Sequence, residues 1–228
     1  PENCAVKDAD TNTEITVDAD RKANVKYDQK ITITAPELTD GDAYEWTNGD
    51  STETGTGNEY TFKVAGDTAI ECNLLKALHI TNEGKPNTTG TKYDADKRTY
   101  YGNGWEYSSS RGILLLNRGE FNFSSTHPQG GGEKTTTPVA CAIEIESGAT
   151  ITGGIFTGGD EEVINYGTIS GGTFQETCSV TNYGTIENGT FSGTVQNTFG
   201  GRISGGTFSK TVQNVSGEIS GGTFQSTS

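Results

Sequence analysis

Residues 167–174 read GTISGGTF, and almost the same eight letters return as GRISGGTF at 201–208 and GEISGGTF at 217–224. Two looser copies, GATITGGIF at 148–156 and GTIENGTF at 184–191, complete a series of five. Self-similarity at a fixed short period is typical of supersecondary units that stack on one another, and not of a single globular core. This repeat therefore decides the fold class of the C-terminal region.

Two apolar columns run through the copies. Successive phenylalanines are 16 to 18 residues apart, and an isoleucine precedes each of them by five residues. At ~3.3 Å per strand residue, such a period forms three short sides, and the chain returns ~4.8 Å above its start. The pattern predicts a single-stranded parallel β-helix with coils of about 17 residues, whose core holds ladders of identical side chains. The predicted ladder residues are Ile151, Ile169, Ile186, Ile203, Ile219, Phe156, Phe174, Phe191, Phe208 and Phe224.

The residues between the ladders carry two further signals. Glycines beside the ladder positions indicate sharp corners, because glycine accepts positive φ and close backbone approach. A V-x-N triplet also recurs between the copies, and it fits either an internal ladder of side-chain amides or exposed turns. The drifting period favours a right-handed coil over the left-handed hexapeptide type.

Residues 1–74 follow another pattern. Five runs with partial alternation (13–19, 24–35, 43–49, 59–65 and 68–74) are separated by turn signals, which indicates short antiparallel strands. Trp46 in a middle run and Cys72 in a late one suit a small β-sandwich. The segment resembles the immunoglobulin-like modules of bacterial surface proteins. We therefore expect an all-β protein with an immunoglobulin-like β-sandwich over 1–74 and the β-helix over 75–228, whose first coils (75–147) are irregular and whose repeats (148–228) are regular.

The four cysteines contain no C-x-x-C pair, and the two histidines lie far apart, so no zinc site is expected. Cys4 and Cys72 bracket the N-terminal segment and could close it with a disulfide, although reduced buried thiols remain an alternative. Cys141 and Cys178 lie in the repeat region.

The charge balance excludes several classes of partner. Sixteen basic residues against thirty acidic ones give a net charge of −14, whereas nucleic-acid binding needs clustered Lys and Arg. No apolar run approaches the ~18 residues of a membrane span, so no membrane insertion is expected in this chain.

The chain opens at Pro1 and its last copy has no cap, so we expect a processed or trimmed chain whose natural form continues.

A second resemblance lies before the repeats. Gly104-Trp105-Glu106-Tyr107, followed by Ile113–Asn117, is similar to the G-W-x-Y…L-x-L-N opening of ISGGTF-repeat β-helical surface proteins of gut-type Gram-positive bacteria. Together with the repeats it covers roughly residues 100–228. The resemblance implies a secreted or wall-attached, extracellular protein with an adhesin-like role, and some β-helical relatives bind acidic plant polysaccharide.

The repeats contain few side chains that could act in catalysis or bind a metal ion. Asp160-Glu161-Glu162 is the one acidic cluster there, and a solvated acidic turn is the preferred interpretation. Aspartate pairs such as Asp8/Asp10 and Asp94/Asp96 could lend oxygens to calcium, but none shows an EF-hand pattern. No cofactor is therefore expected.

Aromatic side chains are the remaining candidates for ligand contact, because flat rings stack on sugars. For the aromatic segment around Trp105, the preferred interpretation is that it caps the first coil of the β-helix, and sugar binding is the alternative. We expect a non-catalytic, monomeric surface protein that binds a glycan or a host or cell-surface ligand. The alternatives are a polysaccharide lyase or hydrolase acting on acidic glycans and a purely structural stalk. The candidate contact residues are Tyr100, Tyr101, Trp105, Tyr107, Tyr166 and Tyr183.

Overall fold

The computed structural model describes residues 3–38, 42–49, 51–55, 57–78, 80, 85–89, 91–123, 138–140, 142–157 and 162–225. Within these ranges all helical or extended structure is β-strand, so the predicted all-β class is confirmed. The chain divides into two units, Pro1–Lys76 and Ala77–Ser228.

The first unit contains two three-stranded antiparallel sheets, in the orders β1-β2-β5 and β4-β3-β6. Trp46 of one sheet stacks on Tyr60 of the other, with ring centroids 5.5 Å apart, and both belong to one buried cluster. The predicted identity as an immunoglobulin-like module stays a prediction. The strands are β1 (Ala5–Asp8), β2 (Lys30–Thr34), β3 (Ala43–Asn48), β4 (Ser51–Gly55), β5 (Glu59–Lys63) and β6 (Ile70–Leu75).

One predicted strand of this unit is wrong. Residues 13–19 form no strand, and Glu14 makes only an isolated bridge to Lys7. The Asp8 carboxylate accepts the backbone N–H of Thr11, and the Asp18 carboxylate accepts that of Lys22. These turns interrupt an extended backbone on both sides of the run.

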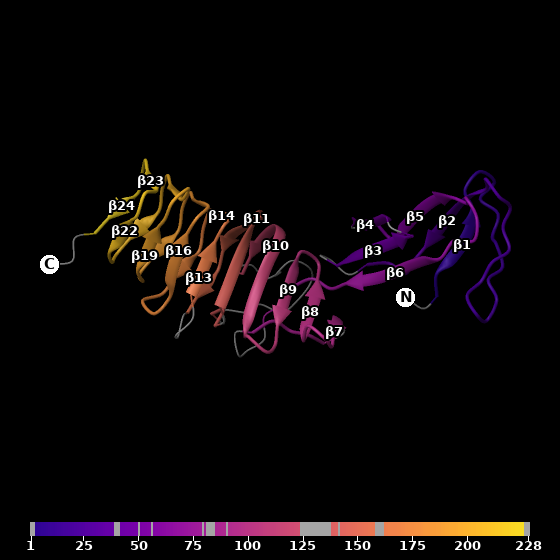
Figure 1. Cartoon of the computed structure of the whole chain (residues 1–228), viewed down its shortest axis with the longest axis horizontal. Coiled ribbons are helices and arrows are strands. Elements are labelled where there is room, and N and C mark those ends of the chain that lie inside the picture. Colours follow the sequence, from indigo (N-terminus) through magenta and orange to yellow (C-terminus); the bar gives the residue numbers. More distant parts are fainter. Residues whose placement is uncertain are drawn as a thin grey trace. The chain divides into compact units, whose positions relative to one another are not determined.

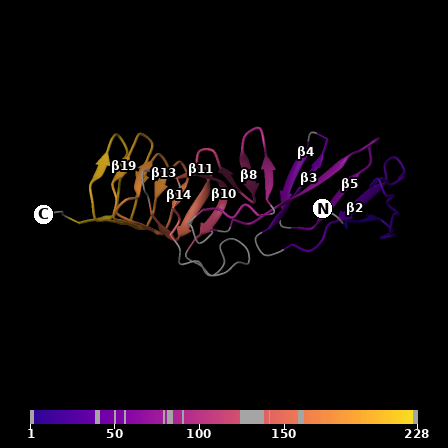
Figure 2. The same cartoon turned by 90° about the horizontal axis from the view of Figure 1, so that it is seen from below.

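The second unit is a parallel β-solenoid with coils of about 17 residues, as the repeat predicts (Figures 1 and 2). One sheet has the order β22-β19-β16-β13-β11-β10-β9-β8-β7, joined by β14, β17, β20 and β23, and a five-stranded sheet has the order β12-β15-β18-β21-β24. The hand of the coil stays a prediction. The early strands are β7 (Lys92–Asp94), β8 (Thr99–Gly102), β9 (Trp105–Ser108), β10 (Ile113–Asn122), β11 (Ala142–Gly153) and β12 (Ile155–Phe156). The strands of the regular coils are β13 (Glu162–Asn165), β14 (Thr168–Ile169), β15 (Thr173–Phe174), β16 (Ser179–Asn182), β17 (Thr185–Ile186), β18 (Thr190–Phe191), β19 (Val195–Asn197), β20 (Arg202–Ile203), β21 (Thr207–Phe208), β22 (Val212–Asn214), β23 (Glu218–Ile219) and β24 (Thr223–Phe224).

The isoleucines and phenylalanines of the repeat pair in register from coil to coil. The phenylalanine rings stack nearly parallel, with centroids 4.6 Å apart at Phe156–Phe174 and 5.1 Å apart at Phe208–Phe224. Both columns are buried until the last coil, where Ile219 is 38% and Phe224 49% exposed. The ladders therefore form the core, and their last members lie at its open end.

In each copy of the repeat, one glycine with positive φ turns the chain between the isoleucine and the phenylalanine. Gly172 and Gly206 have φ values of 107° and 103°, which side-chain-bearing residues rarely adopt. A Cβ on Gly171 would collide with the carbonyl oxygen of Thr152 in the coil before. The corner glycines therefore satisfy both the turn and the close approach of successive coils.

Strands β7, β8 and β9 differ from the coils expected from residue 75 onward. They pair antiparallel with one another, and β9 pairs antiparallel with β10. Parallel pairing begins only between β10 and β11. An antiparallel meander therefore continues the sheet where early coils were expected.

Candidate functional site

The aromatic residues of β8 and β9 belong mostly to the core. Trp105 is fully buried, and Tyr100 and Tyr107 pack against the same apolar cluster. The prediction that Trp105 contacts a ligand is therefore wrong, because its ring has no exposed face. Tyr101 points to the opposite side of the strand from Tyr100 and is half-buried.

Tyr166 and Tyr183 form a stacked pair on the surface of the solenoid. Their ring centroids are 5.0 Å apart with an interplanar angle of 16°, and each residue is 42% exposed. The stack follows from the register, because Asn165 pairs with Asn182 and the tyrosines come next in the chain. Three strands (β9, β10 and β11) separate this pair from Tyr101 on β8, so the structure does not bring the two groups together.

Below these tyrosines lies a ladder of buried amides. Asn165 Nδ2 donates to Asn182 Oδ1 at 2.7 Å, and Asn182 Nδ2 donates to Asn197 Oδ1 at 2.8 Å. Asn197 Nδ2 continues the ladder to Asn214 Oδ1 at 2.8 Å. The first three asparagines are completely buried, so the V-x-N triplets form an internal ladder and not exposed turns.

The same amides hold the corner that follows them. Asn182 Nδ2 also lies 3.2 Å from the carbonyl oxygen of Gly184, directly after Tyr183. A Cβ on Gly184 would collide with the carbonyl oxygen of Gly167 in the coil before. The backbone that carries Tyr183 is therefore fixed from both sides.

Phe199 is an exposed aromatic residue that the repeat pattern did not identify. It follows Asn197 by two residues at the corresponding corner of the next coil and is 83% exposed. This corner is two residues longer than that of Tyr183: Thr198 takes the position equivalent to Tyr183, and Gly200, with a φ of 87°, follows Phe199. A search for aromatics near each V-x-N triplet, without fixed spacing, would have found it. We call Tyr166, Tyr183 and Phe199 the aromatic corner.

Two carboxylates flank the first ring of the corner. Glu144 and Glu146 lie on β11, the strand paired with β13, and both are half-buried on the same face of the sheet. Partial desolvation raises the pKa of the Tyr166 hydroxyl, and the negative charges of Glu144, Tyr183 and Glu146 raise it further. The Tyr166 ring therefore lies in a negatively charged environment, which Glu144 and Glu146 create.

Of the acidic cluster Asp160-Glu161-Glu162, only Glu162 lies within the described residues. Asp160 and Glu161 lie outside the described residues, as does Cys141. Glu162 is exposed, and its carboxylate accepts a hydrogen bond from the Thr181 hydroxyl. This contact shows how Glu162 is held but provides no paired acid and base.

The aspartates considered for calcium shape turns. The Asp94 carboxylate accepts the backbone N–H groups of Asp96 and Lys97, each at 3.0 Å. In the described part of the chain, no group of three or more His, Cys, Asp or Glu residues is placed to hold a metal ion.

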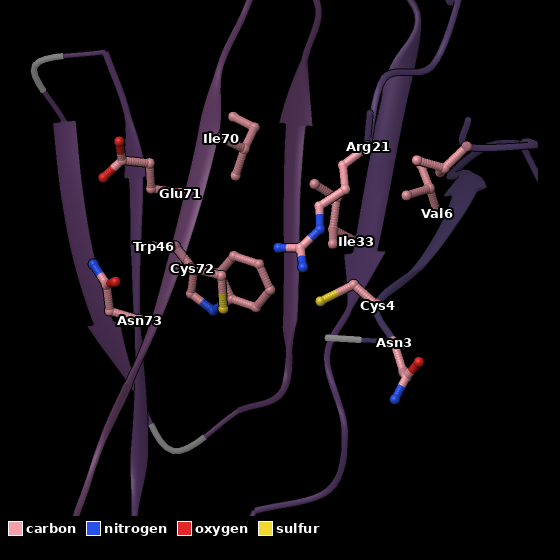
Figure 3. Close-up of a pocket in the computed structure, with 11 residues that line it drawn as sticks. Asn3, Cys4, Val6, Arg21, Ile33, Trp46, Ile70, Glu71, Cys72 and Asn73 are labelled. Carbon is pink, nitrogen blue, oxygen red and sulfur yellow. The ribbon is translucent and has the colours of Figure 1, made fainter. Parts of the chain in front are cut away.

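The first unit contains a cavity of about 440 Å³ between its sheets. Its walls include Cys4 and Ile33 on one side and Trp46 and Cys72 on the other, and Figure 3 shows the Arg21 guanidinium pointing into it. Both cysteines are thiols in the structure, which corresponds to the reduced alternative and not to the disulfide considered between them. Burial raises the pKa of the Cys72 thiol to about 12, which disfavours the reactive thiolate.

No helix in the described ranges is long and apolar enough to cross a membrane. Comparisons with family models, curated proteins and solved structures found no match to this chain.

Proposed function

We propose that this protein is a non-catalytic extracellular surface protein whose solenoid binds a glycan along the aromatic corner. One observation carries the proposal: three successive coils each present an exposed aromatic side chain at the same corner. Scattered exposed apolar side chains need no explanation, but a row repeated in successive coils does.

Aromatic rings suit this role because they offer a large apolar face at low cost in conformational entropy. The stacking of Tyr166 on Tyr183 covers one face of each ring. The outer faces of the pair, their exposed edges and the Phe199 ring remain for contact. The corner thus offers a row of contacts spaced by coils and not a single flat platform.

The solenoid supports such contacts by holding them rigidly. The amide ladder and the corner glycines fix the backbone under each ring. A preorganised surface loses less conformational entropy on binding. Because successive coils lie ~4.8 Å apart, an extended polymer would contact several coils at once.

The proposed location and partner follow from the sequence resemblance. The ISGGTF repeats and the G-W-x-Y opening are similar to surface proteins of gut-type Gram-positive bacteria, which favours a cell-surface or cell-wall location and an adhesin-like role. In this proposal the partner is a glycan of a host or of another cell.

Affinity electrophoresis against a panel of immobilised polysaccharides tests the proposal. For a glycan that retards the protein, Tyr183→Ala and Phe199→Ala should each weaken binding by on the order of fivefold. Tyr27→Ala is the matched control, because Tyr27 is 76% exposed but lies in the first unit. Equal loss in all three variants would contradict a site at the corner.

The two alternative functions, an enzyme and a structural stalk, predict different results with the same purified protein. Release of products from an acidic polysaccharide, with or without added calcium, and its loss in Glu162→Gln would support an enzyme. Failure to bind any glycan in a broad panel would support a structural stalk.

A further inference from the structure

We propose that the aromatic corner selects glycans that carry ammonium groups over glycans that carry carboxylates. This inference deepens the proposed glycan binding and rests on it. It comes from the charges around the corner and not from the rings themselves.

The carboxylates nearest the corner lie along one face of β11. Glu144 pairs in register with Ile164 of β13, and Glu146 follows Ile145, the register partner of Asn165. Because Tyr166 follows Asn165, Glu146 lies one coil before Tyr166, on the side of the ring that Tyr183 does not cover. A ligand stacked on that outer ring face would meet both carboxylates.

The positive charges of the regular coils are already paired. Residues 148–228 contain two basic residues, Arg202 and Lys210. Arg202 forms an ion pair with Glu218 at 3.2 Å, and Lys210 forms one with Glu176 at 2.8 Å. A carboxylated glycan along these coils would therefore have to compete with existing partners for a cation.

Before the regular coils, the last basic residue within the described ranges lies on β10; Lys134, which follows it in the sequence, lies outside those ranges. Arg118 is exposed and pairs in register with Gly148 of β11, which places it two coils before the level of Tyr166. Its one positive charge against the two negative charges of Glu144 and Glu146 leaves this group of side chains with a net negative charge. Like charges near a binding surface disfavour a wrong partner, while opposite charges fix the right one.

An ammonium-bearing sugar suits both features of the site. Its ring can stack on Tyr166, and its ammonium group can lie over a ring face or between the two carboxylates. A carboxylated sugar gains the same stacking but is repelled by Glu144 and Glu146. A neutral sugar gains the stacking alone and should be intermediate.

Three oligosaccharides of equal length test the selectivity by isothermal titration calorimetry near pH 6: oligomers of glucosamine, N-acetylglucosamine and galacturonate. We expect the dissociation constant to be smallest for glucosamine and largest for galacturonate. The glucosamine preference over N-acetylglucosamine should be on the order of fivefold at low salt and should shrink when NaCl is raised.

The double substitution Glu144→Gln with Glu146→Gln should abolish that preference while leaving N-acetylglucosamine binding unchanged. Glu187→Gln removes the same charge from an exposed position after β17 and serves as the control. Circular dichroism of each variant establishes that it is folded.

The outcomes separate the two proposals. Binding of the neutral oligomer with no preference for glucosamine, or a preference that survives the double substitution, overturns the selectivity but leaves glycan binding intact. Tighter binding of the galacturonate oligomer than of the glucosamine oligomer also overturns the selectivity, because it shows a preference for carboxylates. If none of the three oligomers binds and the polysaccharide panel is also negative, glycan binding fails and the selectivity fails with it.

Discussion

Asn182 is the residue on which the solenoid's internal polar structure depends most. Its side chain accepts from Asn165 and donates to Asn197 in a fully buried environment. Removing one member of such a network leaves the partners' buried polar atoms without hydrogen bonds, and that penalty exceeds the value of the bonds themselves.

We therefore predict that Asn182→Ala lowers the free energy of unfolding of the solenoid by about 2–4 kcal/mol. Asn188→Ala is the control, because Asn188 is exposed and its side chain bonds only to its neighbour Gly189. Urea denaturation followed by circular dichroism measures both. A loss below about 0.5 kcal/mol for Asn182→Ala would contradict the structural role of the ladder.

Cys178 predicts a dependence of stability on alkaline pH. Burial raises the pKa of its thiol from an ordinary value of 9.0 to about 12. Between these values the unfolded chain loses a proton that the folded chain keeps, so the stability present below pH 9 falls as the pH rises.

The wild type should therefore lose about 1.5 kcal/mol more than Cys178→Ala between pH 9 and 10.5. Parallel urea titrations of the two proteins at several pH values measure this difference. Identical pH profiles would show that the Cys178 thiol is not protected by burial.

Single residues also show where sequence reasoning stops. The stacking of Tyr166 on Tyr183 follows from the spacing of the V-x-N triplets, because register places equivalent residues one coil apart. Phe199 was missed because its corner is two residues longer than that of Tyr183. Trp105 was misassigned because proximity to other aromatics in sequence does not indicate which face of a strand is covered.

At the scale of the elements, the phenylalanine ladder allows a buried member and an exposed member of one column to be compared. Phe191 is 1% exposed between two stacked neighbours, whereas Phe224 in the last coil is 49% exposed. Phe191→Ala should cost about 3–5 kcal/mol through lost burial and the cavity left behind, and Phe224→Ala about 1 kcal/mol.

Thermal and chemical denaturation of the two variants test this prediction. Similar losses at both positions would mean that the last coil is covered in solution. The result thus also bears on Ile219, which is 38% exposed in the same coil.

The elements differ in how well sequence predicts them. The short strands of the coils were predictable because a fixed period constrains every copy at once, so five weak signals add to one strong signal. Strands β1 and β4 have no such support: AVKD and STETG are short and largely polar, and their pairing partners decide their conformation. The antiparallel meander β7–β9 was missed because its aromatic residues suggest strands without indicating their direction.

At the scale of the whole molecule, the two units have separate buried clusters. One cluster contains Trp46 and the other contains Trp105. These are the only two tryptophans in the chain, so each unit carries its own fluorescent reporter.

We predict that the protein unfolds in two steps and that Phe191→Ala lowers the midpoint of only one of them. In a Trp105→Phe background, the fluorescence of Trp46 should report an unchanged midpoint, while calorimetry shows the shifted step. A common shift of both signals would contradict separate cores.

The amide ladder has a direction, and that direction has an evolutionary consequence. Every side-chain donor from Asn165 to Asn197 points to the following coil, so each interface between coils carries the same acceptor and the same donor. An in-frame duplication or deletion of one coil therefore keeps the same amide donor and acceptor at every remaining interface of the ladder. Gain or loss of a coil therefore changes the length of the solenoid by ~4.8 Å and requires no compensating mutation in the amide ladder.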